Sequence, residues 1–140
     1  FIHASLASSI SILHILFNML WLKDLGSMVE ARQGWLRLAL LVVVISAASN
    51  LAQFFHRGPL FGGMSGVVYG LLGYIWMKGK FDPGSGYDIH PNTVAFMLIW
   101  FVFCLVIPAL PIANTAHGVG LGVGVAWGYL ASLWTSPRHR

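Results

Sequence analysis

The chain has 140 residues, of which 57% are hydrophobic and 9% are charged. Because about a quarter of the residues in a typical soluble domain are charged, this composition excludes an ordinary soluble protein and indicates one membrane-embedded domain over residues 1–140. The formal net charge of +4 gives no reason to expect nucleic-acid binding, since the basic residues fall in short clusters between apolar runs, where lipid headgroups attract them.

Five apolar segments follow one another along the chain. They are residues 4–22, 35–55, 65–77, 93–110 and 115–134. Four of them approach the roughly 20 residues that a membrane-spanning helix needs, and they lack the alternation of apolar and polar residues that indicates strands. We therefore predict an all-α membrane protein in which the charged stretches after each segment are connections.

The basic residues are distributed unevenly between the two sides of the membrane. One side has Arg57, and the other has the remaining seven: Lys23, Arg32, Arg37, Lys78, Lys80, Arg138 and Arg140. The positive-inside rule then predicts that the first segment runs inwards, that the loop 56–64 lies outside, and that the C-terminus is cytoplasmic. Five spans that start outside lead us to expect a sixth helix upstream of this sequence.

The third segment opens on a serine between glycines, Gly63-Met64-Ser65-Gly66. With Lys78 and Lys80 at the inner headgroups, the helix from Ser65 spans about 24 Å, less than the roughly 30 Å of the hydrocarbon core. Ser65 would then lie below the outer surface, where irregular backbone requires enclosing protein or a watery cavity. The N–H groups of a helix start can stabilise an oxyanion, although such motifs also occur where small residues pack between membrane helices.

His117 lies in the first turn of the fifth segment. Gly120 and Gly124 lie on the same helix face as His117. A similar glycine stripe, formed by Gly66, Gly70 and Gly73, follows Ser65. Two such stripes let helices approach closely. Because both segments run the same way, Ser65 and His117 would lie near the outer end as nucleophile and general base. The alternative is a histidine that hydrogen-bonds a neighbouring helix as a packing contact.

Other polar side chains within the segments have two interpretations each. His14 and Asn18, spaced by four residues, share a face and are candidates for oxyanion stabilisation or for a structural clamp between helices. Tyr69, four residues after Ser65, is a candidate to stack on His117, or an ordinary buried aromatic residue. No acidic residue lies in any segment, so the sequence favours a Ser-His dyad over a triad. Two residues of the second segment are expected to be structural: Asn50 and Gln53.

Three motifs, in this order on separate segments, resemble those of the rhomboid intramembrane serine proteases of bacterial type. They are His14-x-x-x-Asn18, Gly63-Met64-Ser65-Gly66-Val67-Val68-Tyr69-Gly70 and Ala116-His117-x-x-Gly120-x-x-x-Gly124. The resemblance implies a rhomboid-like bundle of six core helices, of which this sequence has five and lacks the first with its following loop. It implies Ser65 as nucleophile and His117 as base. It also implies an oxyanion site of His14, Asn18 and the Ser65 N–H, with Tyr69 supporting the base.

The resemblance also implies how substrates enter and where the protein resides. The helix 93–110 and the cap at 108–114 would gate entry, with Phe17 and Trp100 as the aromatic pair between the gate helix and its neighbour. The partners would be transmembrane protein substrates within the lipid bilayer, with no cofactor and no metal. The location would be the bacterial inner membrane, with the active site open to the periplasmic side.

Two other function classes remain as alternatives. The first is a non-catalytic rhomboid-like membrane protein that binds transmembrane clients. The second is a channel or transporter with His14 and His117 on a proton path, although the intramembrane acids and inverted repeats common in such proteins are missing from the sequence.

Overall fold

The computed structural model describes residues 2–57, 65–106 and 114–135, and within these ranges the chain forms five α-helices and one short 3-10 helix. The helices are α1 (Ile2–Gln33), α2 (Trp35–Arg57), α3 (Ser65–Phe81), η1 (Pro83–Ser85), α4 (Pro91–Val106) and α5 (Asn114–Thr135). The prediction of an all-α bundle is confirmed.

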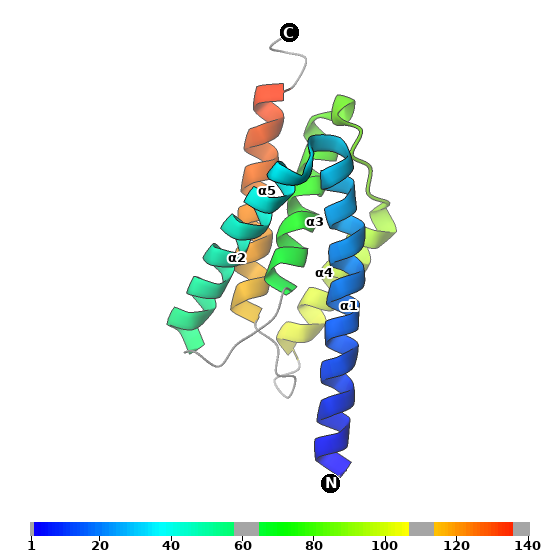
Figure 1. Cartoon of the computed structure of the whole chain (residues 1–140), viewed down its shortest axis with the longest axis vertical. Helices are drawn as coiled ribbons and strands as arrows, with labels where there is room; N and C mark the ends of the chain where they lie inside the picture. The colour runs from blue at the N-terminus through cyan, green and yellow to red at the C-terminus, as the bar shows by residue number, and fades with distance from the viewer. Residues whose placement is uncertain (1, 58–64, 107–113, 136–140) are drawn as a thin grey trace.

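Helix α3 lies in the middle of the bundle, with α2 and α5 to one side and α1 and α4 to the other (Figure 1). The helices α1, α3 and α5 all begin at the same end. We call this the Ser65 end, and we call the opposite end, where α1 joins α2, the Gly34 end. The third and fifth helices therefore run in parallel, as the sequence analysis expected.

Helix α1 is longer than predicted, because it continues from the apolar segment 4–22 through the charged stretch to Gln33. The stretch contains no proline, and Leu25 and Val29, one turn apart, are both buried and extend the apolar face. The helix ends at Gly34, whose φ of 86° is left-handed and whose N–H donates to the Glu30 carbonyl at 2.9 Å. This is the αL termination that glycine favours, and it leaves one residue between α1 and α2.

Helix α3 begins at the predicted residue, Ser65, and extends four residues past the predicted end to Phe81. Its 17 residues correspond to about 25 Å, which is shorter than the hydrocarbon core of a bilayer. Helix α2 begins at the predicted residue, Trp35, and the other bounds of α2, α4 and α5 differ from the prediction by one to four residues. Of the predicted loop 56–64, His56 and Arg57 belong to α2, and Asn114 of the predicted cap 108–114 is the first residue of α5. Residues 58–64 and 107–113 lie outside the described residues.

The buried face of α2 repeats every four residues. Its members are Leu41, Ile45, Ser49 and Gln53. The two members near the Gly34 end are apolar and join the core around α3. The two near the Ser65 end are polar, so α2 presents hydrogen-bonding groups towards the starts of α3 and α5.

At the Gly34 end, one side chain joins three parts of the chain. The amide oxygen of Gln33 accepts hydrogen bonds from the Tyr74 hydroxyl of α3 at 2.6 Å and from the Tyr87 hydroxyl of the following loop at 2.9 Å. Burial raises the pKa of the Tyr87 hydroxyl above its usual value. The bonds tie the end of α1 to α3 and to the loop that follows α3.

The placement of Lys78 corrects the prediction that it reaches the lipid headgroups. Its side chain is buried, and its Nζ lies 2.9 Å from Oδ2 of the equally buried Asp82. The two residues are one helical turn apart, a spacing that allows opposite charges to pair. Lys80, in contrast, is exposed, with its ammonium group 5.5 Å from the ring centre of Phe81.

Large apolar side chains remain exposed along the outside of the bundle. Examples are Leu20 of α1, Val43 of α2, Ile99 of α4 and Leu130 of α5. Among the described helices, one is both long and apolar enough to cross a membrane, over Trp35–His56, and a shorter apolar stretch covers Pro91–Phe103. The exposed apolar surface is what a protein surrounded by lipid requires.

Candidate active site

The first turns of α3 and α5 are in direct backbone contact. A Cβ atom added to Gly66 would lie 3.0 Å from the Ala116 carbonyl oxygen, and one added to Gly120 would collide with the Gly66 carbonyl. Gly66 therefore sits between two successive turns of α5. Because Ser65 precedes Gly66 and His117 follows Ala116, the two candidate residues lie at the same level of neighbouring helices.

The contact continues along both glycine stripes. A Cβ on Gly124 would collide with the Gly70 carbonyl, and a Cβ on Gly73 would lie 2.9 Å from the Leu121 carbonyl oxygen. Small residues at four-residue spacing allow two membrane helices to pack backbone to backbone. The stripes thus fix the distance between α3 and α5 over several turns.

His117 is 1% exposed and lies against two aromatic rings. The Tyr69 ring centre is 5.0 Å from the imidazole centre at an interplanar angle of 39°, and the Phe101 ring of α4 is 6.4 Å away. The Tyr69 hydroxyl in turn donates to the Met97 carbonyl of α4 at 2.9 Å. Tyr69 therefore connects the imidazole on α5 with the backbone of α4.

The Ser65 end of α2 holds the start of α5 through two side chains. The backbone N–H of Ala116 donates to the Gln53 side-chain oxygen at 3.1 Å, which satisfies one of the N–H groups that a helix start leaves unpaired. One turn further along α2, His56 Nδ1 and Thr115 Oγ1 are 2.6 Å apart. Ser49 completes this side, because its Oγ would lie 2.8 Å from a Cβ on Gly66.

Helix α4 meets α1 through aromatic rings. The Phe17 ring centre lies 6.2 Å from that of Trp100 and 6.3 Å from that of Phe96. Both distances fall within the range of favourable aromatic pairs. The expected aromatic pair of Phe17 and Trp100 therefore lies in contact, and its role in a gate stays a prediction.

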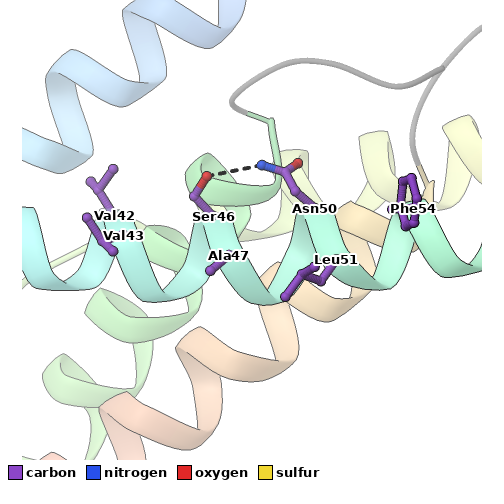
Figure 2. Close-up of a pocket in the computed structure, with 7 residues that line it drawn as sticks. All are labelled: Val42, Val43, Ser46, Ala47, Asn50, Leu51 and Phe54. Carbon is purple, nitrogen blue, oxygen red and sulfur yellow. Dashed lines mark hydrogen bonds between the residues drawn. The ribbon is translucent and has the colours of Figure 1, made fainter. Parts of the chain in front are cut away.

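The outward face of α2 has a shallow hollow that is separate from this constellation. Its lining includes the apolar Val43, Leu51 and Phe54 and one polar pair, in which the Asn50 amide donates to the Ser46 hydroxyl at 3.1 Å (Figure 2). Asn50 and Gln53, both expected to be structural, thus have different partners: one bonds within α2, and the other bonds to α5.

The sequence matches a known protein family. The profile of the Rhomboid domain matches residues 2–134. The chain belongs to the rhomboid family. It is 40% identical over 129 residues to proteins named "Rhomboid protease GlpG" from Klebsiella pneumoniae strain 342 and from Klebsiella pneumoniae subsp. pneumoniae. Each match covers 91% of this chain and 47% of the relative, so the chain spans about half the length of the curated relatives it matches.

Membership of the rhomboid family makes this chain an integral membrane protein of the bacterial GlpG type.

Several residues that the sequence analysis selected lie in the expected elements. Asn18 and His14 are in α1, four residues apart, and Ser65 is the first residue of α3. The side chains of His14 and Ser65, and all of Gly63, lie outside the described residues. The roles of these residues therefore stay predictions.

Sequence reasoning missed three polar residues of this rhomboid that border the constellation: Ser49, His56 and Thr115. Ser49 could have been found from its spacing of four residues before Gln53, which places both on one face of α2. The contact between His56 and Thr115 joins residues 59 apart in the sequence, and no local pattern indicates it.

In the described part of the chain, no group of three His, Cys, Asp or Glu side chains is arranged to hold a metal ion.

Proposed function

We propose that this chain is the catalytic core of an intramembrane serine endopeptidase that cleaves transmembrane segments of other membrane proteins. The observation that carries the proposal is the position of Gly66 between Ala116 and Gly120, which sets Ser65 and His117 at one level on packed helices. Membership of the rhomboid family and the Tyr69 ring against the imidazole support the same assignment.

In the proposed reaction, Ser65 Oγ attacks the carbonyl carbon of the scissile peptide bond while its proton passes to His117. The resulting oxyanion accepts hydrogen bonds from the Ser65 N–H and from His14 and Asn18. Collapse of this intermediate breaks the C–N bond, and His117 gives its proton to the leaving amine. Water, activated by His117, then hydrolyses the acyl ester and restores the Ser65 hydroxyl.

The proposed orientation follows the distribution of basic residues. The Ser65 end faces the periplasm, and the Gly34 end, with Arg32, Arg37 and Lys80, faces the cytoplasm of a bacterial inner membrane. A substrate helix would enter between α1 and α4, where Phe17 and Trp100 meet. The substrate must unwind locally to expose its amide, so small or helix-breaking residues are expected at the cleaved bond.

Labelling with a fluorophosphonate, followed by intact-mass measurement, tests the assignment. We expect one adduct on the wild-type protein and none on Ser65→Ala or His117→Ala, while all variants keep their helical circular dichroism. Ser132→Ala is the matched control, because Ser132 is a buried serine on α5 whose hydroxyl donates to the Tyr129 carbonyl; this variant should label normally. The test is made on the 140-residue chain and on the full-length protein. If neither folded wild-type protein labels or cleaves a transmembrane peptide in liposomes, the proposal fails, and the alternative of a non-catalytic protein that binds transmembrane clients is favoured.

A further inference from the structure

The start of α5 is held from α2 by a contact that the proposed chemistry does not use. His56 is the penultimate residue of α2, and Thr115 is the second residue of α5. Their Nδ1 and Oγ1 atoms are 2.6 Å apart, so either the Thr115 hydroxyl donates to the ring nitrogen or a protonated Nδ1 donates to the hydroxyl. Thr115 is two residues before His117.

Other contacts restrain His117 in different directions. The Tyr69 and Phe101 rings limit the imidazole from the α3 and α4 side. The glycine stripes set the separation and the relative height of α3 and α5, but they have no side chain that would restrain rotation of the first turn of α5. Gln53 binds one N–H of the first turn. A side-chain contact from α2 to Thr115 adds a restraint against rotation of that turn.

We propose that His56 is a positioning residue for the base: through Thr115, it fixes the rotation of the first turn of α5 so that His117 meets Ser65. The proposal rests on the proposed function, because it assumes that His117 activates Ser65. A small displacement of a catalytic group is costly, since a misplacement of about 1 Å can lower a rate by about 100-fold. His56 itself is exposed and takes no part in the bond-making steps.

The test measures the rate of fluorophosphonate labelling and the kcat and KM for a transmembrane peptide, in the full-length protein reconstituted in liposomes. His56→Ala and Thr115→Val should each lower the labelling rate and kcat by roughly 10- to 100-fold, with KM and the melting temperature little changed. The double variant should be no slower than the slower single variant, because both changes remove the same contact.

Conservative variants separate positioning from general stability. Asparagine carries its amide atoms at the place of Nδ1, whereas glutamine carries them at the place of Nε2. His56→Asn and Thr115→Ser should therefore recover most of the rate, and His56→Gln should not. His90→Ala is the matched control, because His90 is an exposed histidine at the Gly34 end whose Nδ1 accepts the Asn92 N–H at 3.0 Å.

Equal rates in wild type and His56→Ala, or a loss of rate that follows the melting temperature across all variants, would overturn the positioning role while leaving the Ser-His assignment in place. Absence of labelling in a folded wild-type protein would overturn both.

Discussion

Replacing single glycines of α5 by alanine tests the backbone contact between α3 and α5. A Cβ on Gly124 would collide with the Gly70 carbonyl, whereas a Cβ on Gly122 meets nothing within 4 Å. Both substitutions gain up to about 1 kcal/mol from the higher helix propensity of alanine. That gain is shared, so it cancels when the two variants are compared.

The remaining difference is the cost of fitting the methyl group against a backbone that cannot rotate away. Overpacking of this kind costs about 1–3 kcal/mol, and it forces α5 away from α3 and His117 away from Ser65. We therefore expect Gly124→Ala to be less stable than Gly122→Ala by about 1–3 kcal/mol and to label more slowly with fluorophosphonate. Gly122→Ala should match or exceed the stability of the wild type.

The assay is reversible unfolding in mixed micelles, followed by circular dichroism, with the labelling rate measured on the same samples. Equal free energies of unfolding for Gly124→Ala and Gly122→Ala would show that α3 and α5 are not in backbone contact. The level at which Ser65 and His117 meet would then have to be argued anew.

Three further predictions concern other contacts. Lys78→Met leaves the Asp82 carboxylate buried without its ammonium partner and should lower the free energy of unfolding by about 3–5 kcal/mol. The double variant Lys78→Met, Asp82→Leu removes both charges and should lose much less stability. Chemical denaturation of both variants checks this. Because the pKa of Tyr87 is raised from 10.0 in the folded protein, its contribution is fully present below pH 10 and is lost as the pH rises further. Melting temperatures should therefore fall more steeply above pH 10 in wild type than in Tyr87→Phe. Tyr69→Phe keeps the ring against His117 but removes the hydrogen bond to the Met97 carbonyl, so the free energy of unfolding should fall by about 0.5–1.5 kcal/mol, while the labelling rate of Ser65 should stay close to that of wild type.

The helices and the glycine contact could be predicted because their signals are local. Hydropathy located the segments, and the serine between glycines in Gly63-Met64-Ser65-Gly66 indicated where α3 begins. Spacing by four residues placed Gly120 and Gly124 on the His117 face and Tyr69 above Ser65. These periodicities are properties of a single helix, and they survive whatever the helix packs against.

The features that could not be predicted depend on neighbours far along the chain. Charges from Lys23 to Arg32 indicated a connection, but exposed charges do not end a helix, and α1 continues until Gly34 supplies a left-handed residue. Lys78 and Asp82 have the spacing of an ion pair, yet their burial depends on the surrounding helices. The contact between His56 and Thr115 exists only because the end of α2 and the start of α5 meet in the folded bundle.

The single residue between α1 and α2 also restricts how this sequence can change in evolution. Each residue added to an α-helix turns everything after it by about 100°. With Gly34 as the whole linker, an insertion in the first turn of α2 has no slack to absorb that rotation. It would swing the Leu41–Gln53 face out of the core and take His56 away from Thr115. Length variation among related sequences should therefore be suppressed at this joint and concentrated in the loop between α3 and α4.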